Sequence, residues 1–536
     1  TLQNHKTHLT ISLSGSYLTM KLGVIAIVIS VSVIKSEEVK PLNILAIFPF
    51  PGKSHGIIFN NLLEALVRRG HNLTHVSYFP INKPLKNYRH IHLAEDTSAK
   101  VLEDVLLLES SYFTVLDVNK LVVVAGNENC KILLENKHMQ KLWMGKTKFD
   151  LVVSEYFSTD CPLAIAHRLG APVVGVTGCT LMAWQFDTLG IPFNPSFVPQ
   201  QFLDGDSKPT LFQRIERTLF HHYFNLYYKL IGQSTDEQTV KRYFDDVPSL
   251  SELAGNVKIV LMNTYWMLFD FNLLPPNVIE IGGFHVSGNK SLPNKLLQFI
   301  EESEHGVIYV SFGSIIKSSA SSDPDKIEKI VGALSKLPQR IIWKWEDPKP
   351  PGNLDKIYVS KWLPQKDILA HPKVLAFLSH CGLVSTTEAV TFGVPIVGMP
   401  IFGDQPTNAA AIEEKGFGVR VQLSELTSEH LLKKFKTEVI NSTAKVKSLS
   451  KSWQDRPMKP METAIFWTEF AARHPNHTFR APAADVPLYQ YLNLDILLVF
   501  LVFALTVFLG FKYLISLVFI NVGRKSTKAK KLCKKQ

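Results

Sequence analysis

The stretch FLSHCGLVSTTEA, residues 377–389, joins an apolar run typical of a buried strand to the expected start of a helix. It places His380, Gly382, Ser385 and Glu388 at this junction. Backbone N–H groups in the first turn of a helix lack partners within the helix, and they attract anions such as phosphate. The His and Ser side chains would add donors at the same point. The stretch therefore indicates a phosphate site, and the simpler alternative is that Ser385 only caps its helix.

A second expected strand ends in a similar way. Its last residues place Ser311, Gly313 and Ser314 in a glycine turn, which leaves backbone N–H groups free to hold phosphate oxygens. Ligands of open α/β sheets bind at the carboxyl ends of the strands. The two strand ends are therefore expected to lie in the same site.

Two further pairs of residues flank these strand ends. Trp362 and Gln365 lie in the proline-braced sequence KWLPQ, and Asp404 and Gln405 lie in PIFGDQ after another expected strand. From Trp362 to Gln405 the chain has 44 residues, counting both ends. These two pairs and the phosphate-binding strand end of residues 377–389 thus fall within one short interval.

This interval closely resembles the donor-binding signature of the UDP-glycosyltransferase family, which includes UDP-glucuronosyl- and UDP-glucosyltransferases. The pattern F-L-S-H-C-G-x-x-S-x-x-E, followed after six residues by P-I-V-x-x-P-I-x-x-D-Q, runs complete from Phe377 to Gln405. The resemblance covers nearly the whole chain from Met20, and its details are similar to insect members. It implies an α/β fold of the GT-B type, in which two Rossmann-like domains face a cleft, and inverting transfer from a UDP-sugar.

The resemblance implies a role for each of these residues. Trp362 would stack on uracil, Gln365 would contact the base or ribose, and Glu388 would accept hydrogen bonds from the ribose hydroxyls. Asp404 and Gln405 would bind sugar hydroxyls. The groups expected around the diphosphate are small or hydrogen-bonding residues at strand ends: Ser311, Gly313, Ser314, His380, Gly382 and Ser385. The chain departs from many relatives at Val384, where they carry Asn, so one phosphate contact is lost or supplied otherwise.

His55, in the sequence PFPGKSHG, is expected on the loop after the first strand and facing the cleft. A lone loop histidine is usually only solvated, but the resemblance implies that His55 is the general base that deprotonates the acceptor hydroxyl. A carboxylate should orient its imidazole and stabilise the positive charge. Glu155, at a strand end, and Asp160, in the next loop, are both candidates, and we favour Asp160 because relatives carry "DC" there.

The pattern of elements predicts where these residues sit. Strand and helix signals alternate in both halves, as expected for parallel sheets covered by helices. The expected parts are an N-terminal acceptor-binding Rossmann-like domain (41–275), a linker (276–285), a C-terminal UDP-sugar-binding Rossmann-like domain (286–452), and a return helix with a pre-membrane segment (453–490). The aromatic and basic segment 211–232 is compatible with a membrane-surface helix, an acceptor-pocket wall or ordinary core packing.

The two ends of the chain predict a membrane protein. Residues 1–19 resemble a translated leader, and 20–36 have the basic and apolar regions of a signal peptide. Residues 496–520 carry one charge, Lys512, and are long enough to cross a bilayer, while 521–536 form a basic tail expected in the cytosol. We therefore expect a single-pass type I protein of the endoplasmic reticulum membrane with lumenal catalytic domains. Four sequons suit a lumenal glycoprotein: Asn72, Asn289, Asn441 and Asn476.

Charge and cysteine content exclude other classes of function. The net charge is +11, but the tail supplies seven of these charges and residues 1–36 supply three, which leaves +1 on residues 37–520. Nucleic-acid binding therefore has no support from charge. The five cysteines show no metal-like spacing, and any disulfide cannot be paired from the sequence. No metal or permanently bound cofactor is expected, because a helix N-terminus and His380 would stabilise the leaving UDP.

These observations predict an enzyme that transfers a hexose, with UDP-glucose the expected donor, to hydroxyls of small lipophilic acceptors, as in detoxification or pigment and hormone conjugation. Use of UDP-glucuronic acid is the alternative donor choice. A silent relative that binds UDP-sugar or lipophiles without turnover is a second class of function. A lectin or adhesion protein would not need Trp362 and Glu388 in this pattern. Homo-oligomerisation is left open.

Overall fold

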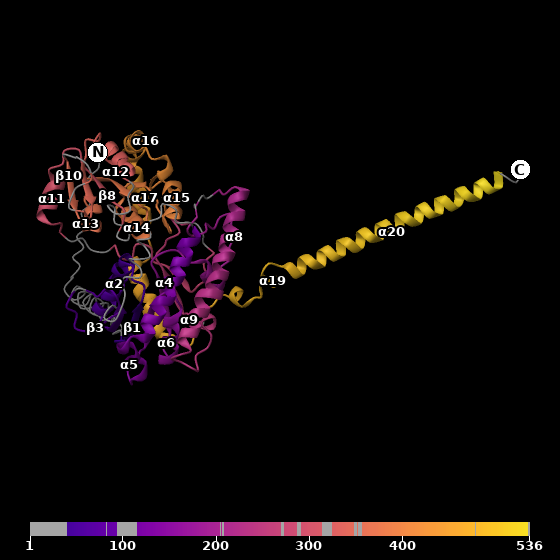
Figure 1. Ribbon diagram of the computed structural model, residues 1–536, viewed down its shortest axis with the longest axis horizontal. Coiled ribbons are helices and arrows are strands. Elements are labelled where there is room, and N and C mark those ends of the chain that lie inside the picture. The colour runs from indigo at the N-terminus through magenta and orange to yellow at the C-terminus, as the bar shows by residue number, and fades with distance from the viewer. Residues whose placement is uncertain are drawn as a thin grey trace, which may run out of the picture. The chain divides into compact units, whose positions relative to one another are not determined.

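The computed structural model describes residues 40–81, 83–93, 115–203, 205, 208–269, 273–286, 291–313, 324–347, 351, 356–477 and 479–533. The chain divides into two units, Thr1–Leu42 and Asn43–Gln536, and the described sheets and helices belong to the second (Figure 1). The predicted leader and signal peptide, Ser314 and the sequon at Asn289 lie outside the described residues.

The N-terminal half forms a parallel sheet of seven strands in the order β3-β2-β1-β4-β5-β6-β7. Its strands are short, apolar and mostly buried on both faces, as parallel sheets require. They are β1 (Asn43–Phe48), β2 (Asn72–Ser77), β3 (Tyr88–His92), β4 (Leu151–Glu155), β5 (Val173–Thr177), β6 (Ile259–Met262) and β7 (Val278–Glu280). The helices of this half are α2 (Lys53–Arg68), α4 (Val115–Glu135), α5 (Lys137–Met144), α6 (Cys161–Leu169), α7 (Ala183–Leu189), α8 (Leu211–Tyr227), the π-helical turn η1 (Tyr228–Gln233), α9 (Ser234–Val240) and α10 (Leu250–Gly255).

The C-terminal half forms a second parallel sheet of six strands in the order β10-β9-β8-β11-β12-β13. The strands are β8 (Val307–Ser311), β9 (Arg340–Lys344), β10 (Ile357–Ser360), β11 (Val374–Ser379), β12 (Ile396–Gly398) and β13 (Gly418–Arg420). Its principal helices are α11 (Asn294–Glu301), α12 (Pro324–Leu334), α13 (Gln365–Leu369), α14 (Leu383–Phe392), α15 (Gln405–Lys415), α16 (Ser428–Lys433) and α17 (Thr443–Gln454). The two Rossmann-type sheets confirm the predicted fold class.

Both sheets reverse their strand order at one point, between β1 and β4 in the first and between β8 and β11 in the second. A crevice opens at the carboxyl ends of the strands at such a point. The first reversal places the start of α2 beside the end of β4, and the second places the ends of β8 and β11 together. His55, Glu155, Gly313 and His380 lie at these four points, while Trp362 and Gln365 follow β10 and Asp404 and Gln405 follow β12.

The segment predicted as the linker, 276–285, contains β7, so the first sheet extends to Glu280. After α17 the chain returns to the first half through α18 (Pro460–Arg473), which packs against α2 and the strands of the first sheet. Glu469 of α18 is buried and accepts hydrogen bonds from Arg69 and His71 at the end of α2. The last helix of the body therefore fixes the first one.

A disulfide joins Cys130 of α4 to Cys161 at the start of α6. The sequence left this pairing open, because the two residues come together only through packing of their helices. Among the described residues, one group of possible metal ligands is close enough to hold an ion, and it consists of these two cysteines and Asp236. Its sulfur atoms are already bonded to one another, so they are not available as thiolates.

Asp236 is a buried acid beside this disulfide. Its carboxylate accepts hydrogen bonds from Asn127 Nδ2 and Thr159 Oγ1, both at 2.6 Å. Burial raises the pKa of Asp236 to about 7, although these two hydrogen bonds oppose the shift. The folded protein therefore holds a proton that the unfolded chain, with an ordinary pKa near ~3.9, has already released.

This difference predicts that the free energy of unfolding falls as the pH rises from about 4 to 7, because the unfolded state then binds fewer protons than the folded state. The side chain of Asp236→Asn is neutral at every pH. The unfolding temperature of this variant should therefore fall less between pH 5 and pH 8 than that of the wild type, by about 2–6 °C. Tryptophan fluorescence during heating in detergent measures this. Asp245→Asn, at an exposed acid, is the control and should leave the wild-type slope unchanged.

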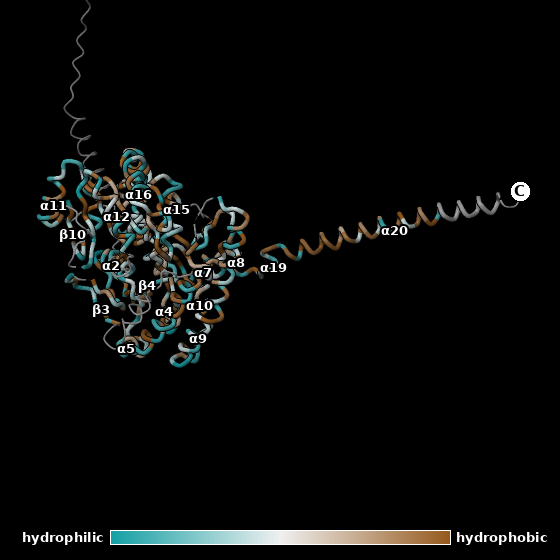
Figure 2. Tube along the Cα trace, turned by 45° about the horizontal axis from the view of Figure 1, so that its top comes forward, coloured by the Kyte–Doolittle hydropathy of each residue, from teal (hydrophilic) through white to brown (hydrophobic). Residues whose placement is uncertain are grey.

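At the C-terminal end, η5 (Pro482–Asp485) and α19 (Leu488–Tyr491) lead into α20 (Leu494–Cys533). Its first part, Leu494–Asn521, is long and apolar enough to cross a membrane and is exposed throughout. Figure 2 shows this apolar run along the helix. The predicted span 496–520 falls within this candidate span.

Candidate functional site

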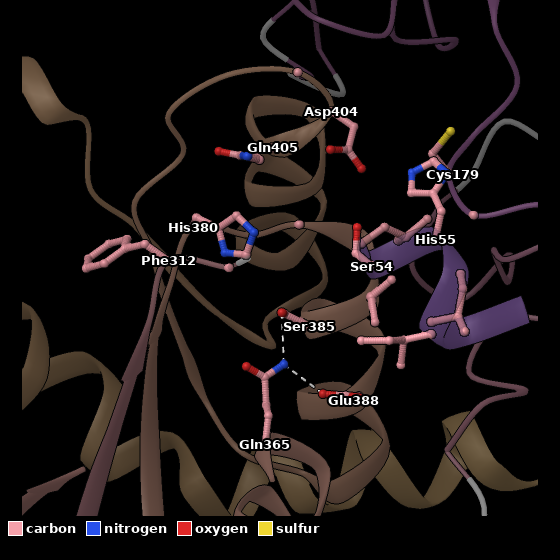
Figure 3. A pocket seen from close by; sticks show the side chains of 18 of the residues that line it. Ser54, His55, Cys179, Phe312, Gln365, His380, Ser385, Glu388, Asp404 and Gln405 are labelled. Carbon is pink, nitrogen blue, oxygen red and sulfur yellow. Dashed lines mark hydrogen bonds between the residues drawn. The ribbon is translucent and has the colours of Figure 1, made fainter. Parts of the chain in front are cut away.

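A cleft of about 410 Å³ lies between the two halves of the described body and is lined by residues from Phe50 to Gln405 (Figure 3). Its walls come from the start of α2, the end of β4 and α4 on one side. The ends of β8, β9 and β11 and the starts of α13, α14 and α15 form the other side. The cleft therefore gathers most of the site residues predicted from the sequence.

His55 and Glu155 form a pair in this cleft. His55 Nδ1 lies 2.6 Å from Glu155 Oε1, and the two side chains are 16% and 3% exposed. His55 lies in the first turn of α2 and not on a loop as predicted, because the helix already begins at Lys53. Since Glu155 holds Nδ1, Nε2 is the ring nitrogen left to exchange a proton with a ligand. Such a pair can act as a general base.

The preference for Asp160 as the partner of His55 is wrong. Asp160 lies at the N-cap of α6, where its carboxylate accepts hydrogen bonds from Tyr228 Oη at 2.8 Å and Gln233 Nε2 at 2.9 Å. Burial raises the pKa of Asp160, and these two hydrogen bonds act against that shift. Its side chain is therefore directed to η1, whereas Glu155 ends its strand directly beside the start of α2.

The rings around His55 restrict how it can move. Phe50 and Phe157 lie with their ring centroids 5.0 and 5.2 Å from the His55 ring, and Phe59 lies at 6.0 Å. A Cβ at Gly178 would lie 3.7 Å from His55 Cε1, an ordinary van der Waals distance, so the chain at Gly178 also packs close to the ring. The imidazole is thus held by packing as well as by its carboxylate.

His380 is enclosed by two glycines. A Cβ on either Gly313 or Gly382 would come within 2.6 Å of His380 Nε2. Gly313 also has a φ of 88°, which disfavours any residue with a side chain. Burial lowers the pKa of His380 to about 4, helped by the nearby charge of Lys344, so at neutral pH the ring offers a hydrogen bond but no positive charge. The glycine-histidine packing leaves the start of α14 open to the cleft.

Ser385, Gln365 and Glu388 are connected by hydrogen bonds. Gln365 Nε2 donates to Ser385 Oγ at 2.9 Å and to Glu388 Oε2 at 2.7 Å, and Tyr309 Oη donates to Gln365 Oε1 at 3.2 Å (Figure 3). Trp362 lines the cleft beside them with half of its surface exposed. These groups can receive a planar base with hydroxyls attached.

Asp404 lies close to His55 at the opposite end of this wall, and Gln405 follows it on the side of His380 (Figure 3). Asp404 accepts a hydrogen bond from Asn408 Nδ2 at 2.8 Å. Burial raises the pKa of Asp404, and the bond from Asn408 and the nearby His55 lower it. The Oε1 atom of Gln405 is occupied by the backbone N–H groups of Ile401 and Phe402, which directs its amide group. The pair therefore offers an acceptor and a donor for hydroxyls near the His55 imidazole.

Two predicted residues contribute differently. Ser311 is buried and its Oγ accepts a 3.4 Å hydrogen bond from the backbone N–H of Gly313, so it shapes the turn after β8. Val384 lines the cleft in the first turn of α14 and offers no hydrogen bond there. The loss of a phosphate contact at Val384 stays a prediction.

Lys344 is a cleft residue that the sequence analysis missed. It ends β9, lines the cleft, is 8% exposed and forms an ion pair with Glu346. In the sequence, a single lysine at the end of a strand resembles a solvated residue. Only the burial of its neighbours on β8 and β9 could have indicated that Lys344 is a buried cleft residue. Lys344 is thus a buried cation beside neutral His380, on a wall of the described cleft that Lys366 also lines.

We expect Lys344→Met to raise the KM for a UDP-sugar about tenfold, because the variant loses a charge-assisted contact to an anion. Initial rates at varied donor concentration measure the change. Glu346→Gln is the control, since it removes the partner of Lys344 and keeps the cation. A tenfold rise with both variants would attribute the effect to disturbed packing.

The fold and site define a class of enzyme with two Rossmann-like domains around a nucleotide-sugar cleft. The solved structure of UDP-glucose: anthocyanidin 3-O-glucosyltransferase in complex with UDP is similar, with a TM-score of 0.53, 17% identity, and coverage of 81% of this chain and 100% of that one. The structure of Phytolacca americana UGT2 complexed with UDP-2fluoro-glucose and pterostilbene has the same TM-score of 0.53 and covers 80% of this chain and 100% of that one. These likenesses establish the GT-B fold.

The model of the family described as UDP-glucoronosyl and UDP-glucosyl transferase matches residues 47–530. UDP-glycosyltransferase UGT5 from Dactylopius coccus is 35% identical over 89% of this chain and 94% of that protein. UDP-glucuronosyltransferase 2B13 from Oryctolagus cuniculus is 30% identical over 83% of this chain and 87% of that protein. The chain belongs to the UDP-glycosyltransferase family and transfers a sugar from a UDP-sugar.

Proposed function

We propose that the protein transfers glucose from UDP-glucose to a hydroxyl of a small lipophilic acceptor, with inversion at the anomeric carbon. The observation that carries this proposal is the 2.6 Å contact between His55 and Glu155, next to Asp404 in the cleft. Similarity to UDP-glucosyltransferase 2 from Dactylopius coccus, at 33% identity over 92% of this chain and 96% of that protein, supports glucose as the sugar.

In the proposed reaction, His55 Nε2 takes the proton of the acceptor hydroxyl while the acceptor oxygen attacks the anomeric carbon. The bond from that carbon to the β-phosphate oxygen breaks, and its electrons leave with UDP. Glu155 stabilises the imidazolium that forms. The start of α14 and the side chains of His380, Ser385 and Lys344 would stabilise the charge on the departing diphosphate.

The other proposed contacts with the UDP-sugar follow from the order of the residues along the C-terminal wall of the cleft. Trp362 would stack on uracil, and Gln365 with Glu388 would bind the base or ribose. Asp404 and Gln405 would bind the hydroxyls of the sugar. Because Asp404 lies near His55, the anomeric carbon would fall between the donor wall and the general base.

The acceptor would occupy the N-terminal side of the cleft, which is mostly apolar. Most of its lining side chains are aliphatic or aromatic, and Ser54, Asn61 and Gln201 add polar groups: Phe50, Ile58, Val122, Phe157, Met182 and Phe202 are the main apolar ones. A mostly hydrophobic site with a few polar groups binds a lipophile and fixes its orientation. His55 is the polar group proposed to direct the acceptor hydroxyl.

We also propose that α20 anchors the protein in the endoplasmic reticulum membrane with both Rossmann-like domains in the lumen. The disulfide between Cys130 and Cys161 supports an oxidising compartment for the N-terminal half. The excess of lysine and arginine over 521–536 supports a cytosolic tail. Cleavage of a signal peptide at 20–36 would produce this orientation.

The test uses microsomes that express the full chain, supplied with UDP-glucose, UDP-glucuronic acid or UDP-galactose and a panel of phenols, flavonoids and steroids. Mass spectrometry then identifies the glycoside. We expect glucosides, with kcat/KM for UDP-glucose at least tenfold above the other donors. A preference for UDP-glucuronic acid would overturn the choice of sugar. Saturable UDP binding without a product from any acceptor would favour the silent binder.

A further inference from the structure

Helix α8 and the turn η1 carry a continuous apolar face that is exposed to solvent. Its side chains are between 48% and 84% exposed, and their spacing places them on one side of the helix: Leu211, Phe212, Ile215, Leu219, Leu226 and Leu230. We call these residues the α8 stripe. An exposed apolar patch of this length marks an interaction surface in a soluble or peripheral domain.

The other side of α8 is firmly attached to the N-terminal domain. Phe224 packs against Phe202 of the cleft wall with centroids 6.0 Å apart, and Tyr228 stacks on Trp184 at 4.3 Å. Tyr228 also donates its hydrogen bond to buried Asp160. The α8 stripe is therefore not a core face that the helix could bury by rotating.

The chain that leads into α20 lies against the same part of the molecule. Arg480 Nη1 donates to the carbonyl of Thr188 at 3.4 Å, and a Cβ at Gly190 would lie 2.6 Å from the backbone nitrogen of Ala484. Both Thr188 and Gly190 lie at the end of α7, and α7 packs along α8. The segment 480–484 is thus fixed beside the end of α7, the helix that packs along α8.

The contact continues to the last residues before the candidate span. Asp187 of α7 accepts hydrogen bonds from Asn225 of α8 and from Lys229 Nζ at 3.1 Å. Burial and the charge of this same Asp187 raise the pKa of Tyr491, so Tyr491 lies near Asp187. Figures 1 and 2 both show α19 beside α8. The span begins at Leu494, and three residues of chain reach at most ~10 Å.

We propose that the α8 stripe lies in the interfacial layer of the bilayer that α20 crosses. A helix of 17 residues is about 25 Å long, and its leucine, isoleucine and phenylalanine side chains suit insertion into the boundary between headgroups and acyl chains. The short connection from Tyr491 to the span holds α8 close to the membrane surface. This inference depends on the proposed membrane anchor and not on the proposed sugar or acceptor.

The position of α8 also relates the bilayer to the acceptor side of the cleft. The stripe faces outward, while Phe224 on the opposite side of the same helix touches Phe202, which lines the cleft. One helix therefore separates the proposed lipid contact from the apolar cleft wall.

The experiment uses the full chain in phosphatidylcholine nanodiscs, with Cys533→Ser to remove the thiol in the tail. Cys179 and Cys381 are buried and react slowly. Leu219→Cys carries an environment-sensitive fluorophore, and doxyl-labelled lipid serves as the quencher. Leu226→Cys is a second position on the stripe in case the first variant does not fold. Glu429→Cys, exposed on α16 of the C-terminal half, is the aqueous control.

We expect a blue-shifted emission at position 219 or 226, with at least twofold quenching by doxyl lipid, and water-like unquenched emission at 429. Water-like emission at both stripe positions would overturn the proposal. Blue-shifted emission without lipid quenching would overturn it in favour of a protein partner, such as a second copy of the chain. A label at Leu505→Cys, within α20, distinguishes a failure of the proposed membrane anchor from a failure of the stripe proposal. Quenching at position 505 with none at the stripe positions would refute the stripe proposal and leave the anchor standing.

Discussion

Replacing His55 with alanine is expected to lower kcat by about 10³-fold, because the variant loses the imidazole that Glu155 holds and that is proposed to take the acceptor proton. The KM for the UDP-sugar should change less than threefold, since the groups expected to hold the donor lie on the other wall. Steady-state rates at saturating acceptor, together with UDP binding by calorimetry, measure both quantities.

His167→Ala is a matched control, because His167 is an exposed histidine on α6 outside the cleft. It should keep the wild-type rate. Added imidazole should restore part of the activity of the His55 variant by occupying the space left by the ring. If the His55 variant kept more than a tenth of the wild-type kcat, His55 would not be the general base.

The fold could be predicted from the sequence because its signals are local. Most strands of both sheets are short apolar runs, with β3 (Tyr88–His92) a polar exception, and several of the turns that follow strands carry glycine or proline. The donor wall was equally accessible, since Trp362, His380, Glu388 and Gln405 lie within one interval of the chain, and their strand ends meet at one edge of the second sheet.

Side-chain direction could not be read in the same way. Glu155 and Asp160 are five positions apart, and both lie near the end of one strand in the sequence. The structure separates them because Asp160 is drawn to Tyr228 and Gln233, residues about seventy positions later in the chain. Sequence patterns do not report such distant partners. The same limit concealed Lys344, whose burial depends on the packing of three neighbouring strands.

Segment 211–232 fits more than one of the interpretations predicted from its sequence. Its inner side chains, such as Phe224, pack into the core and touch the wall of the acceptor side, while its outer side chains form the α8 stripe. Core packing and an acceptor wall were therefore both reasonable predictions from one amphipathic helix. Only the position of the pre-membrane segment beside α7 supports the proposed membrane contact of the outer face of α8.

Replacing Glu155 with glutamine is expected to lower kcat by about 10²- to 10⁴-fold, because the neutral amide no longer stabilises the imidazolium that forms during transfer. The amide can still reach His55 Nδ1, so the ring should stay in place and the KM for the UDP-sugar should change little. Initial rates across pH 5–9 separate the loss of charge from a loss of folded enzyme, because a charge effect persists at every pH.

Asp160→Asn is the decisive companion to this variant. Asparagine can still accept one hydrogen bond at the position that Tyr228 and Gln233 now share, so we expect kcat within threefold of the wild type. If Asp160→Asn were the slow variant and Glu155→Gln the fast one, the original preference for Asp160 would be restored. Glu155→Asp tests the distance itself, because removing one methylene moves the carboxylate away from a 2.6 Å contact while keeping its charge. An intermediate rate for Glu155→Asp would show that the imidazole needs both the charge and its close approach.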